Sequence, residues 1–263
     1  MLYQYMIFDG RTEPVNSYPQ ERYGILYEVI RVTNGVFLFL GDHLERLQYS
    51  AKLAKVTLPP DINFKQQLEE LLKINKVKSG NIKLEFSYRE GKIGHYAFFF
   101  IPHRYPSEDL YSIGFRSTLF YAERQNPNAK VIQQTFIREV DRIIKEKGVY
   151  EVILVHPDGY ITEGARSNFF MVDNGVVYTA PEVDVLPGIT RKYVLQICHE
   201  LSIPLLEKRV EVSHLNKMSA AFISGTSPKV LPVAEIDELK FDPLDPVVRK
   251  IMDRYDEMTG LKK

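Results

Sequence analysis

Apolar residues in the first part of the chain change between the two-residue period of strands and the three-to-four-residue spacing of helices. The pair Asn34-Gly35 separates two apolar runs, which is a strong hairpin signal. A helical pattern begins at Asp42, directly after the second run. The expected elements are strands at 3–8, 23–32, 36–40, 81–88, 94–101 and 112–119, and helices at 42–54 and 63–74.

The second part of the chain follows a polar stretch without periodicity, residues 121–130, which contains Pro127 and indicates an inter-domain loop. Hairpin turns are expected at Asp158-Gly159 and Asn174-Gly175. A helix over 131–147 has the apolar stripe Ile132, Phe136, Val140, Ile143 and Ile144. The other expected elements are strands at 151–155, 160–162, 168–172, 175–179, 205–210, 221–224 and 231–236, and helices at 188–201, 213–217 and from about 245.

Strands dominate the centre of each half, so the predicted fold is α+β with two domains. A small N-terminal α/β domain is expected over residues 1–120 and an inter-domain loop over 121–129. The larger C-terminal domain is expected over 130–263. A chain of 263 residues is long enough for this division.

Composition narrows the classes of function. The 34 Lys and Arg residues equal the 34 Asp and Glu residues, which argues against a nucleic-acid-binding or membrane-surface protein. A single cysteine, Cys198, excludes an internal disulfide and multi-cysteine zinc patterns, and is expected to be a small buried side chain. No signal peptide and no run long enough to span a membrane is found, so the expected location is cytoplasmic.

Two stretches have the composition of anion-binding turns. Pro187-Gly188 precedes a helix that Thr190 is able to cap, and the first amides of a helix attract negative charge. Ser224-Gly225-Thr226-Ser227 follows a strand with small and hydroxyl-bearing residues. Each stretch alone is also what a plain helix cap or an ordinary turn looks like.

Three further side chains carry candidate chemistry. Arg46 is suited to bidentate phosphate binding, although most surface arginines are merely solvated. Lys130 becomes a nucleophile toward carbonyl groups where its pKa is lowered, although a lysine at the start of a helix is usually exposed. Glu163 interrupts the strand pattern between Tyr160 and Val172 with a charge. His43, three residues before Arg46, has no second ligand at metal-binding spacing, so no metal site is predicted.

One amine, one carboxylate, one arginine and two anion-binding turns form a set that suits an aldehyde cofactor with a phosphate and a ring nitrogen. With these residues in order, the chain resembles the class IV, or fold type IV, pyridoxal-phosphate enzymes, which include branched-chain and D-amino-acid aminotransferases and aminodeoxychorismate lyase. The stretches that carry the resemblance are 27–31 (YEVIR), 43–47 (HLERL), Lys130, 160–164 (YITEG) with Asn168, 186–191 (LPGITR) and 224–227 (SGTS).

The resemblance implies a role for each matching residue, and pyridoxal 5'-phosphate as cofactor. Lys130 would hold the cofactor as a Schiff base and move the substrate's Cα proton, and Glu163 would pair with the ring nitrogen. Arg46 would grip the phosphate together with Ile189, Thr190, Gly225 and Thr226, and Leu186 would lie against the ring. The implied fold has a C-terminal domain with a mostly antiparallel β core flanked by helices, and the implied assembly is a homodimer.

The implied reaction is transfer of an amino group between an amino acid and a 2-oxo acid. Candidate substrate-binding residues are Tyr27, Arg31, Arg89, Lys92, His95, Thr226 and Ser227. The alternatives are a lyase that gives 4-aminobenzoate and pyruvate, and a catalytically degenerate homologue. Gln133-Gln134 stands where many members carry Asn or Tyr, and Arg89, Lys92 and His95 differ in spacing from the carboxylate trap of the D-amino-acid enzymes. Arg166, often small in relatives, either lines the pocket mouth or faces solvent.

Overall fold

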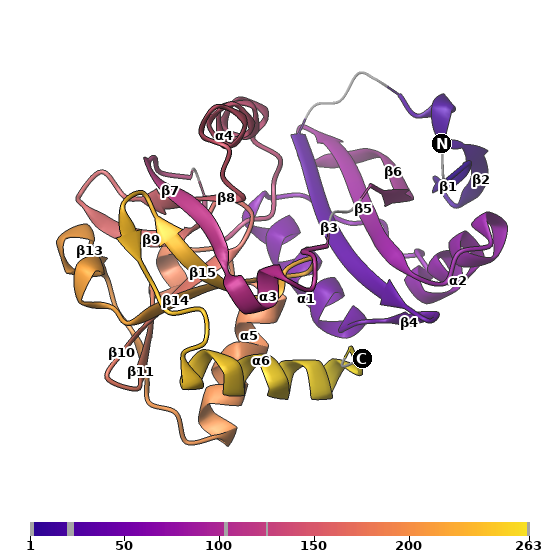
Figure 1. Cartoon of the computed structure of the whole chain (residues 1–263). Coiled ribbons are helices and arrows are strands. Elements are labelled where there is room, and N and C mark those ends of the chain that lie inside the picture. Colours follow the sequence, from indigo (N-terminus) through magenta and orange to yellow (C-terminus); the bar gives the residue numbers. More distant parts are fainter. Residues whose placement is uncertain (1–2, 20–23, 103–104, 125, 262–263) are drawn as a thin grey trace. The chain divides into compact units, whose positions relative to one another are not determined.

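The computed structural model describes residues 3–19, 24–102, 105–124 and 126–261 (Figure 1). The chain forms two compact units, one of Met1–Arg104 with Ala129–Ile132 and one of Tyr105–Asn128 with Gln133–Lys263. Tyr23, the first residue of the strand expected over 23–32, lies outside the described residues. Of the helices in the described ranges, none is both long and apolar enough to cross a membrane.

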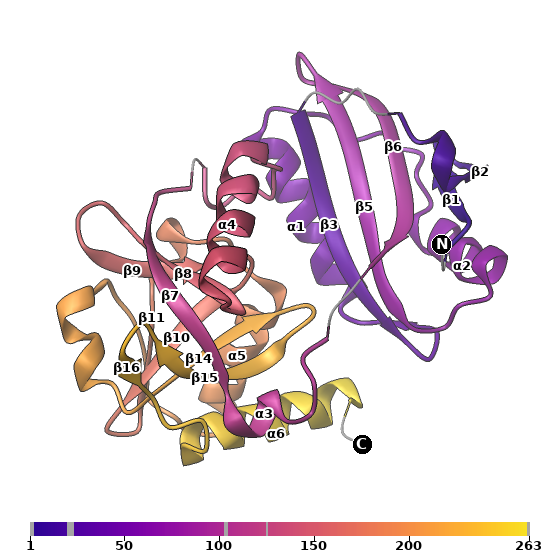
Figure 2. The ribbon, with the colours of Figure 1, turned by 45° about the horizontal axis from the view of Figure 1, so that its top comes forward.

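The first unit is built on one antiparallel sheet with the strand order β2-β1-β6-β5-β3-β4 (Figure 2). Its long central strands pair along their whole length, from Gly24 opposite Tyr88 to Val32 opposite Gly80. The elements are β1 (Tyr5–Phe8), β2 (Arg11–Pro14), the 3-10 helix η1 (Val15–Ser17), β3 (Gly24–Thr33), β4 (Val36–Phe37), α1 (Leu40–Leu53), α2 (Phe64–Asn75), β5 (Gly80–Arg89) and β6 (Lys92–Ile101).

The core of the first unit lies on one face of this sheet. Alternation along β3 buries Leu26, Ile30 and Val32 on that face, where they pack with residues of α1 and α2. The β5 and β6 strands contribute Phe86 and Phe98, whose rings are 6.0 Å apart. The intervening side chains of β3, Tyr27, Val29 and Arg31 among them, therefore point to the opposite face.

The sheet of the second unit is mixed, with the order β12-β11-β10-β14-β15-β7-β8-β9-β13 and β16 beside β15. Most neighbours are antiparallel, whereas β11–β12, β15–β7 and β7–β8 run parallel. Its elements are α3 (Leu110–Ile113), β7 (Phe115–Tyr121), α4 (Gln134–Lys147), β8 (Glu151–Val155), β9 (Tyr160–Gly164), β10 (Asn168–Asp173), β11 (Val176–Thr179), η2 (Glu182–Asp184), α5 (Ile189–Glu200), β12 (Leu205–Glu207), β13 (Val210–Glu211), η3 (Val212–Lys217), β14 (Ala220–Gly225), β15 (Lys229–Ile236), β16 (Leu239–Lys240) and α6 (Pro246–Thr259).

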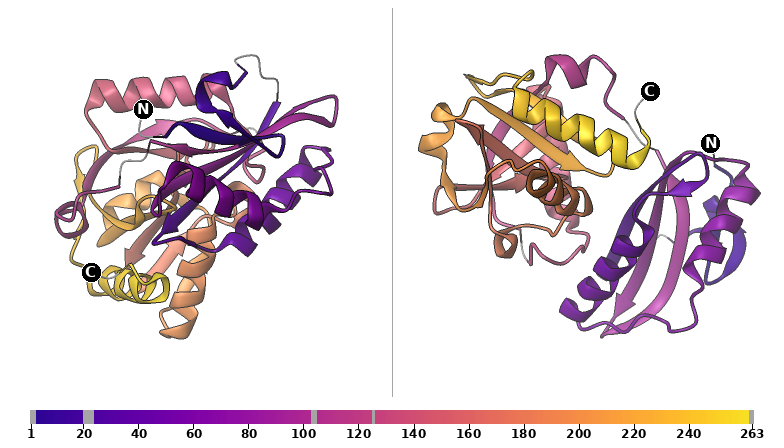
Figure 3. Two further views of the ribbon diagram at one scale, coloured as in Figure 1. Left: turned by 90° about the vertical axis from the view of Figure 1, so that its right-hand side faces the viewer. Right: turned by 90° about the horizontal axis from the view of Figure 1, so that it is seen from below.

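Helices cover the second sheet. The α5 and α6 helices contact each other and β14. The two helices lie next to each other in Figures 1 and 3. The α4 helix packs on β8 through Val140 and Phe136, against Val152 and Leu154. The β8 strand is buried along its whole length, and β9 pairs with it antiparallel.

The division between the units differs from the one expected at residues 120 and 130. The β7 strand runs parallel to both β8 and β15, so residues 105–120 belong with the second unit. Lys130 belongs with the first unit because Ala129–Ile132 hydrogen-bonds along β3, with Val131 bridged to Leu26. Consequently α4 begins at Gln134 rather than at Val131, and Ile132 is outside its apolar stripe.

Several element boundaries also differ from the expected ones. The strand expected over 36–40 ends at Phe37, because Phe39 takes a left-handed conformation with φ 55° and α1 starts one residue later. The strand expected over 112–119 is instead α3 followed by β7, separated by Gly114 at φ 72°. The strand expected over 205–210 is two strands, β12 beside β11 and β13 beside β9. The short strand β2 was not anticipated.

Candidate functional site

Lys130 is held by backbone contacts to β3 and α1. Its carbonyl accepts a hydrogen bond from the Tyr27 amide at 3.1 Å, and its own amide donates to the Ser50 hydroxyl at 3.2 Å. The side chain then reaches the Tyr27 ring, with Nζ 4.6 Å from the ring centroid. The structure thus brings together the proposed nucleophile and a proposed substrate-binding residue, on the sheet face opposite the core.

That same face carries a buried ionic cluster. Lys83, on β5, places Nζ 5.2 Å from the centroid of the Tyr27 ring and 2.5 Å from the Glu85 carboxylate. Glu85 is fully buried and also accepts a hydrogen bond from the Tyr18 hydroxyl at 2.6 Å. The sequence analysis missed these three residues. Their signal was the alternation of Lys83 and Glu85 with apolar residues in β5, which places both charges on one face.

Arg46 and His43 lie on the core side of β3, where both bind Glu28. The Arg46 guanidinium donates from Nε and Nη2 to the two Glu28 oxygens at 2.8 and 2.7 Å, and His43 Nδ1 lies 2.8 Å from Oε2. All three are buried. The structure therefore fixes the Arg46 side chain through a bidentate pair, and Arg46 is not the solvated surface arginine that its helix position suggests.

The burial of this cluster shifts the pKa values of Glu28 and His43. Burial alone would raise the pKa of Glu28, but the charge and hydrogen bonds of Arg46, helped by His43, lower it to about 2. Burial lowers the pKa of His43, and the nearby charges of Arg46 and Lys130 act in the same direction against the opposing effect of Glu28. The cluster is thus one ionised pair with a histidine whose neutral form is favoured.

We expect Glu28→Gln to lower the free energy of unfolding of the cofactor-free protein by about 3–5 kcal/mol, because it leaves the buried Arg46 without its carboxylate. Since the folded pKa of Glu28 lies below the ordinary 4.5, its stabilisation is present above that value and is lost as the pH falls toward about 2. Urea unfolding at pH 7 measures the loss. Glu69→Gln, on the exposed side of α2, is the matched control, and equal stability of the two variants would contradict the pair.

The other basic residues that were candidates for binding the substrate lie at two places in the sheet of the first unit. Arg31 lies on the same face of β3 as Tyr27. Arg89 and His95 instead flank the β5–β6 turn, where Arg89 is mostly exposed beside Glu90 and His95 lies 2.7 Å from Asp9. Lys92, at the start of β6, is also exposed. Among the contacts of the described residues, the partners given for Arg89 and His95 are Glu90 and Asp9.

Glu163 is a buried carboxylate in β9 with only 2 % of its surface exposed. Its Oε2 accepts hydrogen bonds from the Leu186 amide at 3.1 Å and from Asn168 Nδ2 at 3.3 Å. Its Oε1 pairs with Nη1 of Arg124 at 2.9 Å. Three donors from separate segments therefore fix the position of one charge inside the second unit, which answers why the strand pattern tolerates a glutamate here.

The start of α5 lies against Asn168 of β10. Its N-cap is Gly188, not Thr190, and no side chain caps it; Thr190 is the second helical residue and is buried. A Cβ at residue 188 would overlap Asn168 Oδ1, so glycine is required for Asn168 to sit against the helix start. Asn168 also donates to the Leu186 carbonyl at 2.8 Å, which ties the approach to the helix to the neighbourhood of Glu163.

The second small-residue turn lies close by in the sheet. The β10–β14 register places Asn168 opposite Ser224, so the turn of Gly225, Thr226 and Ser227 follows directly beside Asn168. The Pro228 carbonyl accepts a hydrogen bond from Tyr111 at 3.1 Å, which holds the far end of this turn. Within the second unit, Leu186, the α5 start and the 225–227 turn are thus grouped around Asn168, next to Glu163.

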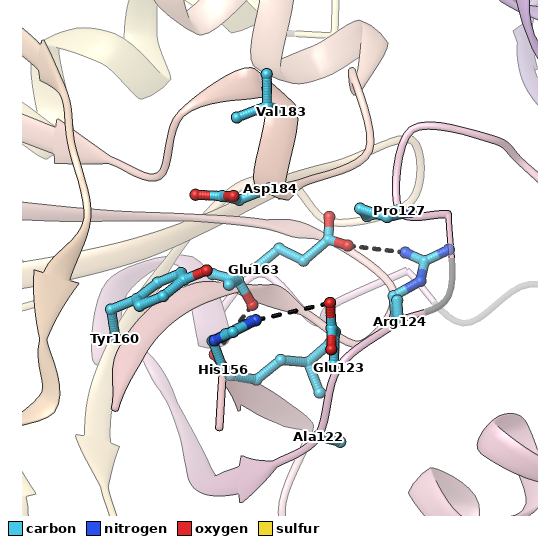
Figure 4. Close-up of a pocket in the computed structure, with 11 residues that line it drawn as sticks. Ala122, Glu123, Arg124, Pro127, His156, Tyr160, Glu163, Val183 and Asp184 are labelled. Atoms are coloured by element: carbon cyan, nitrogen blue, oxygen red, sulfur yellow. Dashed lines mark hydrogen bonds and ion pairs between the residues drawn. The ribbon is translucent and has the colours of Figure 1, made fainter. Parts of the chain in front are cut away.

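Arg124 is a further residue that the sequence analysis missed, since it lies in the stretch interpreted as a loop. It lines a pocket of about 140 Å³ (Figure 4). The other lining residues are Ala122, Glu123, Pro127, Leu154, His156, Tyr160, Thr162, Glu163, Val183 and Asp184. Figure 4 shows the Arg124 guanidinium facing the Glu163 carboxylate from the pocket side. Of the predicted cofactor-binding residues, Glu163 alone is in this lining.

A second buried carboxylate, Glu151, anchors the turn between β9 and β10. Its Oε2 accepts from the Arg166 amide and from the Ser167 hydroxyl, both at 3.2 Å, and its Oε1 accepts from the Val152 amide at 2.9 Å. Burial raises the pKa of Glu151 to about 6, although these hydrogen bonds and the Arg166 charge oppose the rise. Glu151 thus fixes the loop that joins Glu163 to Asn168.

Because the folded pKa of Glu151 exceeds the ordinary 4.5, ionisation opposes folding, and its contribution to stability is lost as the pH rises from about 4.5 to about 6. We expect a pH-dependent loss of about 2 kcal/mol in unfolding free energy, measured from well below about pH 4.5 to well above about pH 6, to disappear in Glu151→Gln. Urea unfolding at several pH values measures it against Glu146→Gln, an exposed glutamate of α4. Identical pH profiles for the two variants would refute the assignment.

The structure also shows where Arg166 and Cys198 lie. Arg166 pairs with Asp141 of α4, and both side chains are more than half exposed, so Arg166 faces solvent rather than the Glu163 pocket. Cys198 is buried, as expected, and burial raises the pKa of its thiol to about 12. In the described part of the chain, no group of three or more His, Cys, Asp or Glu side chains is arranged to hold a metal ion.

Comparisons with known proteins identify a family from the sequence and a fold from the structure. The model of the amino-transferase class IV family matches residues 25–236. A D-alanine aminotransferase of Bacillus licheniformis is 30% identical over 223 residues, covering 81% of this chain and 78% of the relative. The Escherichia coli branched-chain amino acid aminotransferase structure superposes with a TM-score of 0.84 at 21% identity, over 99% of this chain and 96% of that one. The structure of a T.th. branched-chain amino acid aminotransferase with pyridoxamine 5'-phosphate gives 0.82 at 22%, over 99% and 95%.

Proposed function

Because the chain belongs to the amino-transferase class IV family, whose members use pyridoxal phosphate, we propose that Lys130 is the amine that bonds to the cofactor aldehyde during transfer of an amino group to a 2-oxo acid. The observation that carries the proposal is the buried Glu163 carboxylate, fixed by three donors. A permanent buried charge costs free energy, and a protonated ring nitrogen is the partner that makes it useful.

The residues present fit the cofactor. A phosphate with two negative charges needs a guanidinium and several N–H donors, which Arg46 and the uncapped start of α5 are proposed to supply. At Gly188 and Gly225 the side chains of Asn168 and Pro228 pack against the backbone, where a Cβ would meet them. When bound, the cofactor withdraws electrons from the substrate Cα. Ile189, Thr190, Thr226 and Leu186 complete the proposed set.

Lys130 is proposed to act on the substrate proton. The amine must be uncharged to attack a carbonyl or to accept a proton, and nearby positive charge favours that form. Lys83 also reaches the Tyr27 ring, where the buried Glu85 carboxylate, 2.5 Å from its Nζ, balances its charge. With the substrate amine in its place on the cofactor, the Lys130 Nζ would be free to accept the Cα proton and to donate it back on the cofactor side.

Recognition of the substrate carboxylate is proposed to use the Tyr27 face and the Thr226–Ser227 turn. Tyr27 and Arg31 point to the same face as Lys130, and Lys83 adds a charge there that the sequence analysis did not consider. Arg89 and His95 stand as weaker candidates, because Glu90 and Asp9 already engage them. The pairing of Lys83 with buried Glu85 predicts a site that does not present an unbalanced positive charge.

A panel of L- and D-amino acids tests the proposal, because each productive donor converts the cofactor to its amine form and changes its absorbance spectrum without an acceptor. The expected result is conversion by at least one donor, followed by reversal with a 2-oxo acid. Pyruvate release from aminodeoxychorismate without any acceptor would instead establish the lyase. Failure to form the long-wavelength band of lysine-bound cofactor would indicate a degenerate homologue.

The assembly is proposed to be a homodimer, on the strength of the family membership alone. Sedimentation equilibrium at micromolar concentration is expected to give twice the 30.5 kDa mass of the chain. A monomer with full activity would contradict it. The cytoplasmic location stays a prediction.

A further inference from the structure

We infer that Arg124 is a positioning residue that keeps the Glu163 carboxylate ionised, so that the proton shared between Glu163 and the ring nitrogen of bound pyridoxal phosphate stays on the nitrogen. The inference rests on the proposed function of Glu163 and adds a residue that the family motifs in this chain did not single out. It concerns only residues of the second unit.

The geometry gives Arg124 direct access to the charge of Glu163. Nη1 of Arg124 lies 2.9 Å from Oε1, and the two side chains are 11% and 3% exposed, so water screens the pair weakly. The other oxygen, Oε2, is held by the Leu186 amide and by Asn168 Nδ2, both uncharged donors. Within this set, Arg124 is the group that contributes a full positive charge.

The other acids of the pocket have basic partners of their own. Asp184 accepts two hydrogen bonds from Arg209, at 2.8 and 2.9 Å. Glu123 lies 3.6 Å from Nε2 of His156, whose Nδ1 lies 3.4 Å from Asp158 outside the pocket lining. These pairings leave Arg124 matched with Glu163, as Figure 4 shows for the residues that it labels.

Charge decides where a shared proton rests. With the proton on the ring nitrogen, the pair is a cation beside a carboxylate, and with the proton on Glu163 both groups are neutral. A positive charge next to the carboxylate stabilises the first arrangement, because it is closer to the negative oxygen than to the nitrogen. A carboxylate with only 2% of its surface exposed and without such a neighbour favours its neutral, protonated form.

A purely structural role is the competing explanation, because Arg124 could merely tie its segment to β9. The two explanations differ in their response to conservative change. A tether depends on side-chain length and hydrogen bonds, whereas the proposed effect depends on charge. A probe that reports the protonation of the ring nitrogen itself therefore separates them.

The test uses holoenzyme loaded with pyridoxal phosphate labelled with ¹⁵N in the ring, and compares the unmodified protein with Arg124→Gln and Arg124→Lys. The ring ¹⁵N chemical shift at neutral pH is expected to indicate a protonated nitrogen in the unmodified protein and in Arg124→Lys. In Arg124→Gln the ratio of the two protonation forms is expected to change at least tenfold toward the unprotonated nitrogen. Arg116→Gln, on the exposed side of β7, is the control.

An unchanged ¹⁵N shift in Arg124→Gln with cofactor bound would overturn the inference. If Arg124→Gln does not fold or load, Arg124→His replaces it, because the histidine carries or lacks charge with pH in one folded protein. The unmodified protein has its own pH profile, which contains the responses of His156, Glu123, Asp158 and Asp184, and this profile is subtracted. The remaining change in the ¹⁵N shift is expected to follow the titration of the introduced histidine. A profile that matches the unmodified protein would also overturn the inference. An unprotonated nitrogen in the unmodified protein would instead refute the proposed role of Glu163.

Discussion

Lys130→Ala is expected to abolish both the long-wavelength absorbance band of lysine-bound pyridoxal phosphate and all measurable amino transfer. Alanine keeps the backbone hydrogen bonds that join residue 130 to Tyr27 and Ser50, so the segment stays paired with β3. The amine that lies 4.6 Å from the Tyr27 centroid is lost, and with it the nucleophile and the proposed base. Absorbance spectroscopy after cofactor addition and a single-turnover assay with an amino acid measure the two effects.

The control is Lys145→Ala, which removes an exposed lysine of α4. It is expected to retain the band and the turnover. Thermal unfolding of both cofactor-free variants shows whether folding is preserved. A Lys130→Ala protein that keeps the band and the turnover would assign the covalent bond to another lysine.

Glu163→Gln is expected to leave the cofactor bound and to slow removal of the Cα proton by about 10²–10³-fold, the range found when one preorganised electrostatic group is lost. The amide has nearly the same shape and retains an oxygen for the Leu186 amide. It carries no charge, so the ring nitrogen loses its proton and withdraws electrons less strongly. The rate is measured in a stopped-flow half-reaction, with a deuterated Cα to show that proton removal limits it.

Glu123→Gln is the matched control, because this glutamate lines the same pocket but is mostly exposed and pairs with His156. It is expected to react at nearly the unmodified rate. Proton removal by Glu163→Gln at the unmodified rate, with the same isotope effect, would exclude Glu163 as the partner of the ring nitrogen. Arg124 then would have no proton to position.

The strand and helix pattern was predictable wherever local signals agree. The hairpin at Asn34-Gly35 and the α5 helix appear within a few residues of the expected positions. The α+β class and the family were also accessible, because short motifs in a fixed order survive at low overall identity. Expected boundaries failed where pairing partners lie far away in the chain, as for β7 beside β15.

The sequence proposed residue types for the site, but it did not show their contacts. Lys130 and Glu163 were proposed as an amine and a carboxylate, and their roles stay predictions, whereas neither Arg124 nor Lys83 stood out. Arg124 lies in a stretch without periodicity, and its meaning comes from a contact with a residue 39 positions away. Likewise, the depressed pKa of Glu28 depends on a helix side chain that only folding brings to it.

The sequence by itself determined which chemical groups this protein possesses and in what order, because strand alternation, turn residues and motif spacing are local properties. The tertiary structure decided which of these groups are charged, buried and paired. It assigned Arg46 to Glu28, Arg124 to Glu163 and Arg166 to Asp141, choices that three equally charged arginines do not reveal in a linear chain. Burial sets the strength of each pair, because the energy of a charge depends on the water and the partners around it.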